Sequence, residues 1–181
     1  AWAAGIGDDA ALLRPRAGWE RVLTVDALVE DVHFRWRTTD ARSLGRKALR
    51  VNLSDLGAMG ARPLGFLLAL GVPPDVGSQR LDGFMRGLLA EARSAGSPLV
   101  GGDTVRAPVW SLAITAVGEV PQGRALRRGA LCPGDRIFVT AKLNYRKFAW
   151  WNTQWAYAGV RDPAQPVFAL APGHDDGDFI F

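Results

Sequence analysis

Hydrophobic residues gather in segments whose spacing predicts strands and helices. Apolar positions at helical spacing predict one helix from an N-cap at Asp40 to about Met59 and a second over residues 78–95. A Gly-Gly-Asp turn is expected at residues 101–103. Because strands and helices alternate without a strict βαβ rhythm, the fold class is predicted to be α+β, a mixed α/β fold. Runs rich in Val, Leu and Ile predict the strands, at residues 10–14, 21–29, 64–72, 99–100, 109–120 and 137–140.

The ends of the chain lack this regular pattern. The sequence begins abruptly, close to a turn motif, which suggests that its natural beginning is missing. From about Ala141 no period is evident, prolines interrupt the sequence, and three of the seven tryptophans follow. We therefore expect residues 141–181 to form a divergent, Trp-rich tail.

Composition and charge narrow the range of partners. The 181 residues are 48% hydrophobic and 22% charged, as in globular proteins, and the net charge of +4 suits anionic ligands such as phosphates. No basic run is interleaved with aromatic residues, so no nucleic-acid partner is expected. The longest apolar run, residues 64–72, is too short for a bilayer, so no membrane partner is expected. Cys132 is the only cysteine, which excludes an intrachain disulfide and favours a cytoplasmic location.

Aspartates recur beside glycines or at the ends of predicted elements. Such positions often have local structural causes, because aspartate caps turns and helices. Asp55 differs, since it lies on the apolar face of the first predicted helix, where a carboxylate is costly unless paired or metal-bound. Magnesium prefers oxygen ligands and commonly sits between carboxylates and substrate phosphates. No P-loop, GxGxxG, zinc-ligand or GxSxG motif is present. The aspartates therefore indicate a magnesium-dependent nucleotide enzyme.

Four motifs, in this order and with these gaps, resemble the thiamine-monophosphate kinase family, a branch of the aminoimidazole ribonucleotide synthetase superfamily. They are GIGDDAALL, TVDALVEDVHF, VNLSDLGAMGARP and GGDTVR, and the resemblance covers about residues 5–140. It implies ATP-dependent phosphorylation of thiamine monophosphate to thiamine diphosphate, by direct transfer assisted by Mg²⁺. It also implies a mixed sheet packed with helices and a homodimer formed through the sheets.

The resemblance also implies roles for individual residues. Asp8 is a motif neighbour of less defined role, and Val25 stands where the family often has a hydroxyl residue. No residue is assigned as a general acid, base or nucleophile, because an attacking phosphate oxygen is already ionised. The implied magnesium ligands are Asp9, Thr24, Asp26, Asp55 and Asp103. The implied ATP-binding residues are Gly102, Asp103 and Arg128, and His33 matches a position that contacts the substrate.

The domain organisation follows from where the resemblance ends. Residues 1–120 are predicted to form an N-terminal domain that binds ATP and magnesium, and residues 121–140 to begin a C-terminal domain. The second-domain DxSDGL-type motif of the family is absent from the sequence. Two alternatives stay open: a non-catalytic nucleotide-binding dimerisation domain, and another ATP-dependent member of the superfamily. A selenophosphate synthetase is disfavoured because Cys132 lies far from the N-terminus.

Overall fold

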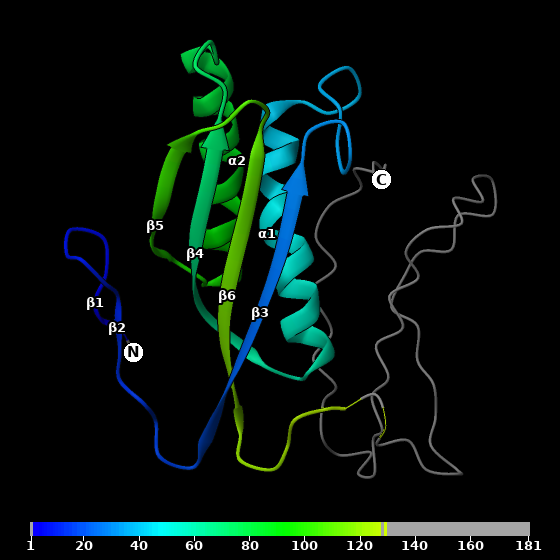
Figure 1. Cartoon of the computed structure of the whole chain (residues 1–181). Helices are drawn as coiled ribbons and strands as arrows, with labels where there is room; N and C mark the ends of the chain where they lie inside the picture. Colours follow the sequence, from blue (N-terminus) through cyan, green and yellow to red (C-terminus); the bar gives the residue numbers. More distant parts are fainter. Residues whose placement is uncertain (1, 128, 130–181) are drawn as a thin grey trace.

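The computed structural model describes residues 2–127 and 129 (Figure 1). A small hairpin pairs β1 (Trp2–Ala4) with β2 (Leu12–Leu13), and the main sheet follows it in the sequence. The remaining elements, in chain order, are β3 (Trp19–Val29), α1 (Ala41–Ala58), β4 (Arg62–Val72), α2 (Ser78–Ala95), β5 (Leu99–Arg106) and β6 (Ser111–Pro121).

The main sheet has the strand order β3-β6-β4-β5. β6 is antiparallel to both β3 and β4, whereas β4 and β5 are parallel and joined through α2. Both helices cover the same face of this mixed sheet (Figure 1). These two layers confirm the predicted α+β class.

The two faces of the sheet differ in burial. On the helix side, Ile114 of β6 pairs with Leu68 of β4, and both are buried. On the other side, Leu23 and Val25 of β3 are 65% and 62% exposed. Side chains alternate between faces along a strand, so one set of residues builds the core and the other forms an open apolar face. No helix within the described part of the chain is long and apolar enough to cross a membrane.

Most predicted elements match the structure. Asp40 caps α1, accepting a hydrogen bond from the Ser43 amide at 2.9 Å, and α2 spans residues 78–95 as predicted. The strand expected at residues 10–14 is reduced to the two residues of β2. The turn expected at residues 101–103 is wrong, because β5 continues through it in parallel register with β4. The strand at 137–140 and the tail at 141–181 lie outside the described residues.

Glycines let the two helices approach closely. A Cβ atom added at Gly87 of α2 would overlap the backbone carbonyl oxygen of Arg42, and one added at Gly45 of α1 would overlap that of Phe84. Side-chain rotation relieves neither overlap, because the atoms in the way belong to the backbone. The packing of α1 against α2 therefore depends on the absence of these two side chains.

We expect Gly87→Ala to lower the free energy of unfolding by about 2–3 kcal/mol, because the helices must separate to admit the methyl group. Urea denaturation monitored by circular dichroism measures this change. Gly57→Ala in α1 is the matched control, since nothing lies within 4 Å of its added Cβ atom. The free energy of unfolding of this control should rise by up to about 1 kcal/mol, because alanine has a higher helix propensity than glycine. Equal stability of the two variants would contradict the packing described for Gly87.

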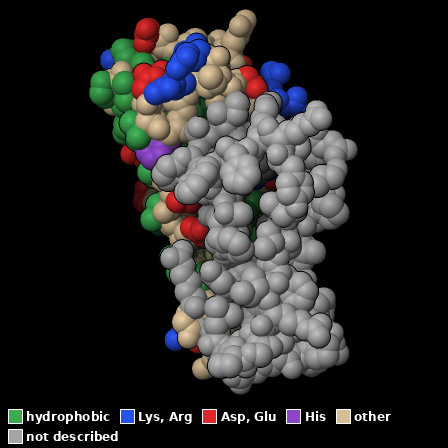
Figure 2. Space-filling view, turned by 90° about the vertical axis from the view of Figure 1, so that its right-hand side faces the viewer, with side chains coloured by type: hydrophobic (Ala, Val, Ile, Leu, Met, Phe, Trp, Pro, Cys, Tyr) green, Lys and Arg blue, Asp and Glu red, His purple; other side chains and the backbone are tan. Residues whose placement is uncertain are grey.

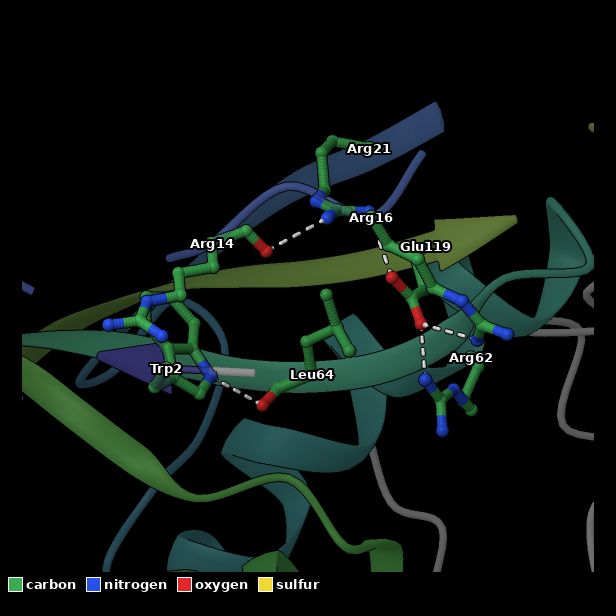
Figure 3. Close-up of polar contacts among 7 residues, drawn as sticks. All are labelled: Trp2, Arg14, Arg16, Arg21, Arg62, Leu64 and Glu119. Carbon is green, nitrogen blue, oxygen red and sulfur yellow. Dashed lines mark hydrogen bonds and ion pairs between the residues drawn. The ribbon is translucent and has the colours of Figure 1, made fainter. Parts of the chain in front are cut away.

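A buried carboxylate joins three strands at the end of the sheet where β3 and β4 begin (Figure 3). Glu119 of β6 is only 2% exposed. Its oxygens accept a hydrogen bond of 2.8 Å from Arg21 and another from Arg62, and Arg16 lies 3.8 Å away. Arg21 also donates to the carbonyl of Arg14, so the cluster ties the segment before β3 to the sheet.

Candidate functional site

Three of the predicted magnesium ligands lie together where α1 packs on β3. The Thr24 hydroxyl on β3 donates a 2.8 Å hydrogen bond to a carboxylate oxygen of Asp55 on α1. Asp26, two residues along the strand, faces the same helix, because side chains alternate along a strand. Both carboxylates are partly buried. The structure thus places Thr24, Asp26 and Asp55 together, although Asp55 is far from the other two in sequence.

The electrostatics of Asp26 and Asp55 favour a bound cation. Burial, followed by the nearby negative charge of Asp55, raises the pKa of Asp26. A raised carboxyl pKa of this kind means that the ionised form lacks a compensating positive charge. Two carboxylates and a hydroxyl are hard oxygen donors, and Mg²⁺ is commonly held by one or two carboxylates plus substrate phosphates. The donor set at Thr24, Asp26 and Asp55 therefore fits Mg²⁺.

Asn52 orients the backbone of Asp26, a role that the sequence analysis does not predict. β3 is an edge strand, and the amide oxygen of Asn52 accepts a 3.1 Å hydrogen bond from the Asp26 backbone N–H. The Asn52 amide group in turn donates to the Ala48 carbonyl at 3.1 Å. The sequence feature that points to Asn52 is its amide side chain, three residues before Asp55 in the VNLSD motif. Asn52 fixes the backbone from which the Asp26 carboxylate projects.

Asn52→Leu should cost about 1–3 kcal/mol of unfolding free energy, because a nearly isosteric side chain leaves the Asp26 N–H without its acceptor. Thr24→Val is the comparison, since it removes a hydrogen bond at a less buried position and should cost less. Chemical denaturation of both variants measures the difference. Wild-type stability in Asn52→Leu would contradict the orienting role.

The other predicted magnesium-binding and ATP-binding residues lie outside the group formed by Thr24, Asp26 and Asp55. Asp103 and Gly102 are on β5, at the opposite edge of the sheet from β3, about 14 Å away at ordinary strand spacing. Asp8 caps its own turn by accepting a 2.9 Å hydrogen bond from the Asp9 amide. Within residues 2–127 and 129, no group of three or more Asp, Glu, His or Cys side chains is placed to hold a metal. The metal roles of Asp9 and Asp103 remain predictions.

His33 lies in the exposed loop between β3 and α1. Its Nδ1 atom accepts a 3.1 Å hydrogen bond from the Val29 amide, and its carbonyl accepts one of 3.0 Å from Lys47 Nζ. The side of the molecule shown in Figure 2 carries several acidic side chains (red). The His33 side chain is exposed. This placement leaves the imidazole accessible to a ligand. Arg128, the predicted ATP-phosphate contact, lies outside the described residues.

Comparison with known proteins agrees with these motifs. Residues 7–120 match the family model described as AIR synthase related protein, N-terminal domain. The chain is 44% identical over 134 residues to thiamine-monophosphate kinase of Synechococcus elongatus, covering 74% of this chain and 41% of that protein. It is also 44% identical over 136 residues to the Escherichia coli enzyme, covering 75% of this chain and 41% of that protein.

Solved structures show the same fold. The thiamine-monophosphate kinase of Stenotrophomonas maltophilia has a TM-score of 0.64 and 46% identity, over 76% of this chain and 41% of that one. AaThiL complexed with AMPPCP and TMP has a TM-score of 0.65 and 30% identity, over 75% of this chain and 43% of that one. A hydrogenase maturation protein, HypE, shares the fold at 23% identity and a TM-score of 0.62.

The candidate β3–α1 site consists of Thr24, Asp26 and Asp55. The chain belongs to the AIR synthase related family, whose N-terminal domain it contains. Within that family it is similar to thiamine-monophosphate kinases, which confirms the resemblance seen in its motifs. The chain spans about 41% of the length of these curated relatives.

Proposed function

We propose that this chain supplies the part of a thiamine-monophosphate kinase that binds Mg²⁺ and ATP. The reaction is the transfer of the γ-phosphate of ATP to thiamine monophosphate, which gives thiamine diphosphate and ADP. The observation that supports it most is the convergence of Thr24, Asp26 and Asp55 at one point of the fold. AaThiL, which shares this fold, was solved with AMPPCP and TMP bound.

In this proposal the chain positions charges and contributes no covalent nucleophile. A phosphate oxygen of thiamine monophosphate attacks the γ-phosphorus, the bond to the β–γ bridging oxygen breaks, and ADP leaves with that electron pair. Asp26 and Asp55 would hold Mg²⁺, which supplies charge neutralisation at the phosphates. Thr24 orients the Asp55 carboxylate and Asn52 orients the Asp26 backbone. His33 contacts the substrate. It does not act as a base, because the attacking phosphate oxygen is already ionised.

Calorimetric titration with AMPPCP, with and without Mg²⁺, tests the nucleotide part of the proposal. We expect binding that requires Mg²⁺, and its absence from a folded chain would refute the proposal. Thiamine diphosphate formation from ATP and thiamine monophosphate then tests the enzyme against its alternative. The alternative is a non-catalytic nucleotide-binding domain. Binding without product would support that alternative.

We also propose that the chain forms a homodimer through the open face of its sheet. Leu23, Val25 and Val105 are large apolar residues more than half exposed, and Leu23 and Val25 lie on that face. A second copy would bury them and would bring a further Asp103 to the assembly. Sedimentation velocity should show a dimer for the wild type and a monomer for Val25→Lys. A monomeric wild-type chain would refute the proposal.

A cytoplasmic location is part of the same proposal. It is supported by the single cysteine, which suits a reducing compartment, and by the use of ATP. Fractionation of cells that express the chain should recover it in the cytoplasmic fraction, and recovery in an extracellular fraction would argue against it.

A further inference from the structure

Lys47 lies between the proposed magnesium ligands, Asp26 and Asp55, and the loop that carries His33. It is on α1, eight residues before Asp55, which places it two turns or about 12 Å along the same helix. Its ammonium donates a 3.0 Å hydrogen bond to the carbonyl of His33. α1 thus carries a carboxylate toward one end of the β3–α1 site and a cation toward the other.

The other cations on this part of α1 are engaged elsewhere. Arg46 and Arg50 both pair with Glu91 of α2, at 3.6 and 2.9 Å. Lys47 is the only lysine within residues 2–127 and 129, and its contact with His33 directs it to the loop that follows β3. Among these three neighbouring cations, Lys47 is therefore the one that lies toward the substrate loop.

We propose that Lys47 binds the phosphate of thiamine monophosphate and holds it for attack on the γ-phosphate of ATP. This role rests on the proposed function and extends it to a residue that no family motif quoted above contains. Two anionic substrates must approach each other beside two carboxylates, so a cation at the substrate end offsets their repulsion. Lysine suits this task as a compact, mobile point charge.

The surroundings of Lys47 support a role for its charge. The side chain is half-buried, and this burial lowers the pKa of the ammonium. A cation held in a partly desolvated place interacts more strongly with an anion than one in bulk water does. The hydrogen bond to the His33 carbonyl holds the ammonium where a phosphate oxygen beside His33 can reach it.

Two substitutions separate the charge of Lys47 from its packing. Lys47→Met keeps an unbranched apolar stem without the ammonium, and Lys47→Arg keeps the charge. With the full chain and saturating Mg²⁺–AMPPCP, calorimetry should show that Lys47→Met weakens thiamine monophosphate binding by about 10- to 100-fold, the range for a charged hydrogen bond. Lys47→Arg should restore most of the affinity.

The affinity for Mg²⁺–AMPPCP is the internal control, and it should be unchanged in both variants. Thiamine without its phosphate should bind wild type and Lys47→Met equally. Unchanged thiamine monophosphate binding in Lys47→Met, or an equal loss for thiamine and its phosphate, would overturn the role of Lys47 and leave the proposed function standing. A wild-type chain that binds neither AMPPCP nor thiamine monophosphate would overturn both.

Discussion

Asp55→Asn should weaken Mg²⁺-dependent AMPPCP binding by at least about 100-fold. Asparagine keeps an oxygen that can accept the Thr24 hydrogen bond but loses the charge that attracts the cation. Substitution of residues that only orient metal ligands typically costs 10- to 100-fold in affinity, so loss of a ligand itself should cost at least as much. Calorimetric titration of nucleotide at fixed Mg²⁺ measures the change.

The same substitution should not harm the folded chain without metal. The negative charge of Asp55 contributes to the raised pKa of Asp26, so its removal relieves a repulsion between the two carboxylates. We expect the free energy of unfolding in EDTA to stay equal or rise. Asp82→Asn, on the exposed surface of α2, is the matched control and should leave Mg²⁺–AMPPCP binding unchanged. Wild-type binding in Asp55→Asn would show that the metal site lies elsewhere.

Glu119→Gln should lower the free energy of unfolding by about 2–3 kcal/mol. The substitution leaves the mostly buried charge of Arg21 without its partner, whereas Arg16 and Arg62 are more than half exposed and are solvated by water (Figure 3). Such a loss is a large part of the 5–15 kcal/mol typical of a domain. Urea denaturation at neutral pH measures it, and a change below 1 kcal/mol would contradict the structural role of the cluster.

The pH dependence of stability gives an independent measure of the same cluster. Burial alone would raise the pKa of Glu119, but the Arg62 hydrogen bond and the charges of Arg62, Arg21 and Arg16 outweigh it and lower the pKa. The pKa of Glu119 is lower in the folded state than in the unfolded state. Its ionised carboxylate therefore stabilises the fold fully above the unfolded-state pKa, and this stabilisation is lost as the pH falls through the folded-state pKa. Glu119→Gln should therefore flatten the acid limb of the stability profile.

Local signals explain which parts of the fold could be predicted. Asp40 is a helix N-cap by its own chemistry, and the apolar spacing of residues 78–95 is sufficient to define α2. The error at residues 101–103 shows the limit of such signals. Gly102 has a φ of +148° and packs against the backbone of Leu68, so the glycines there serve close pairing with β4 inside a strand.

Contacts between distant residues could not be predicted without the fold. Asp26 and Asn52 are 26 positions apart, and Arg21 and Glu119 are 98 apart. No local periodicity reports that these side chains meet. The motifs nominated Thr24, Asp26 and Asp55 separately, and only the packing of α1 on β3 shows that they share a site. The strand order places Asp103, on β5, at the opposite edge of the sheet from them.

The most direct test of the β3–α1 site is anomalous diffraction from crystals grown with AMPPCP and Mn²⁺, which replaces Mg²⁺ at oxygen-rich sites. We predict an anomalous peak between the carboxylates of Asp26 and Asp55, adjacent to the nucleotide phosphates. Bound nucleotide with every manganese peak away from Asp26 and Asp55 would contradict it.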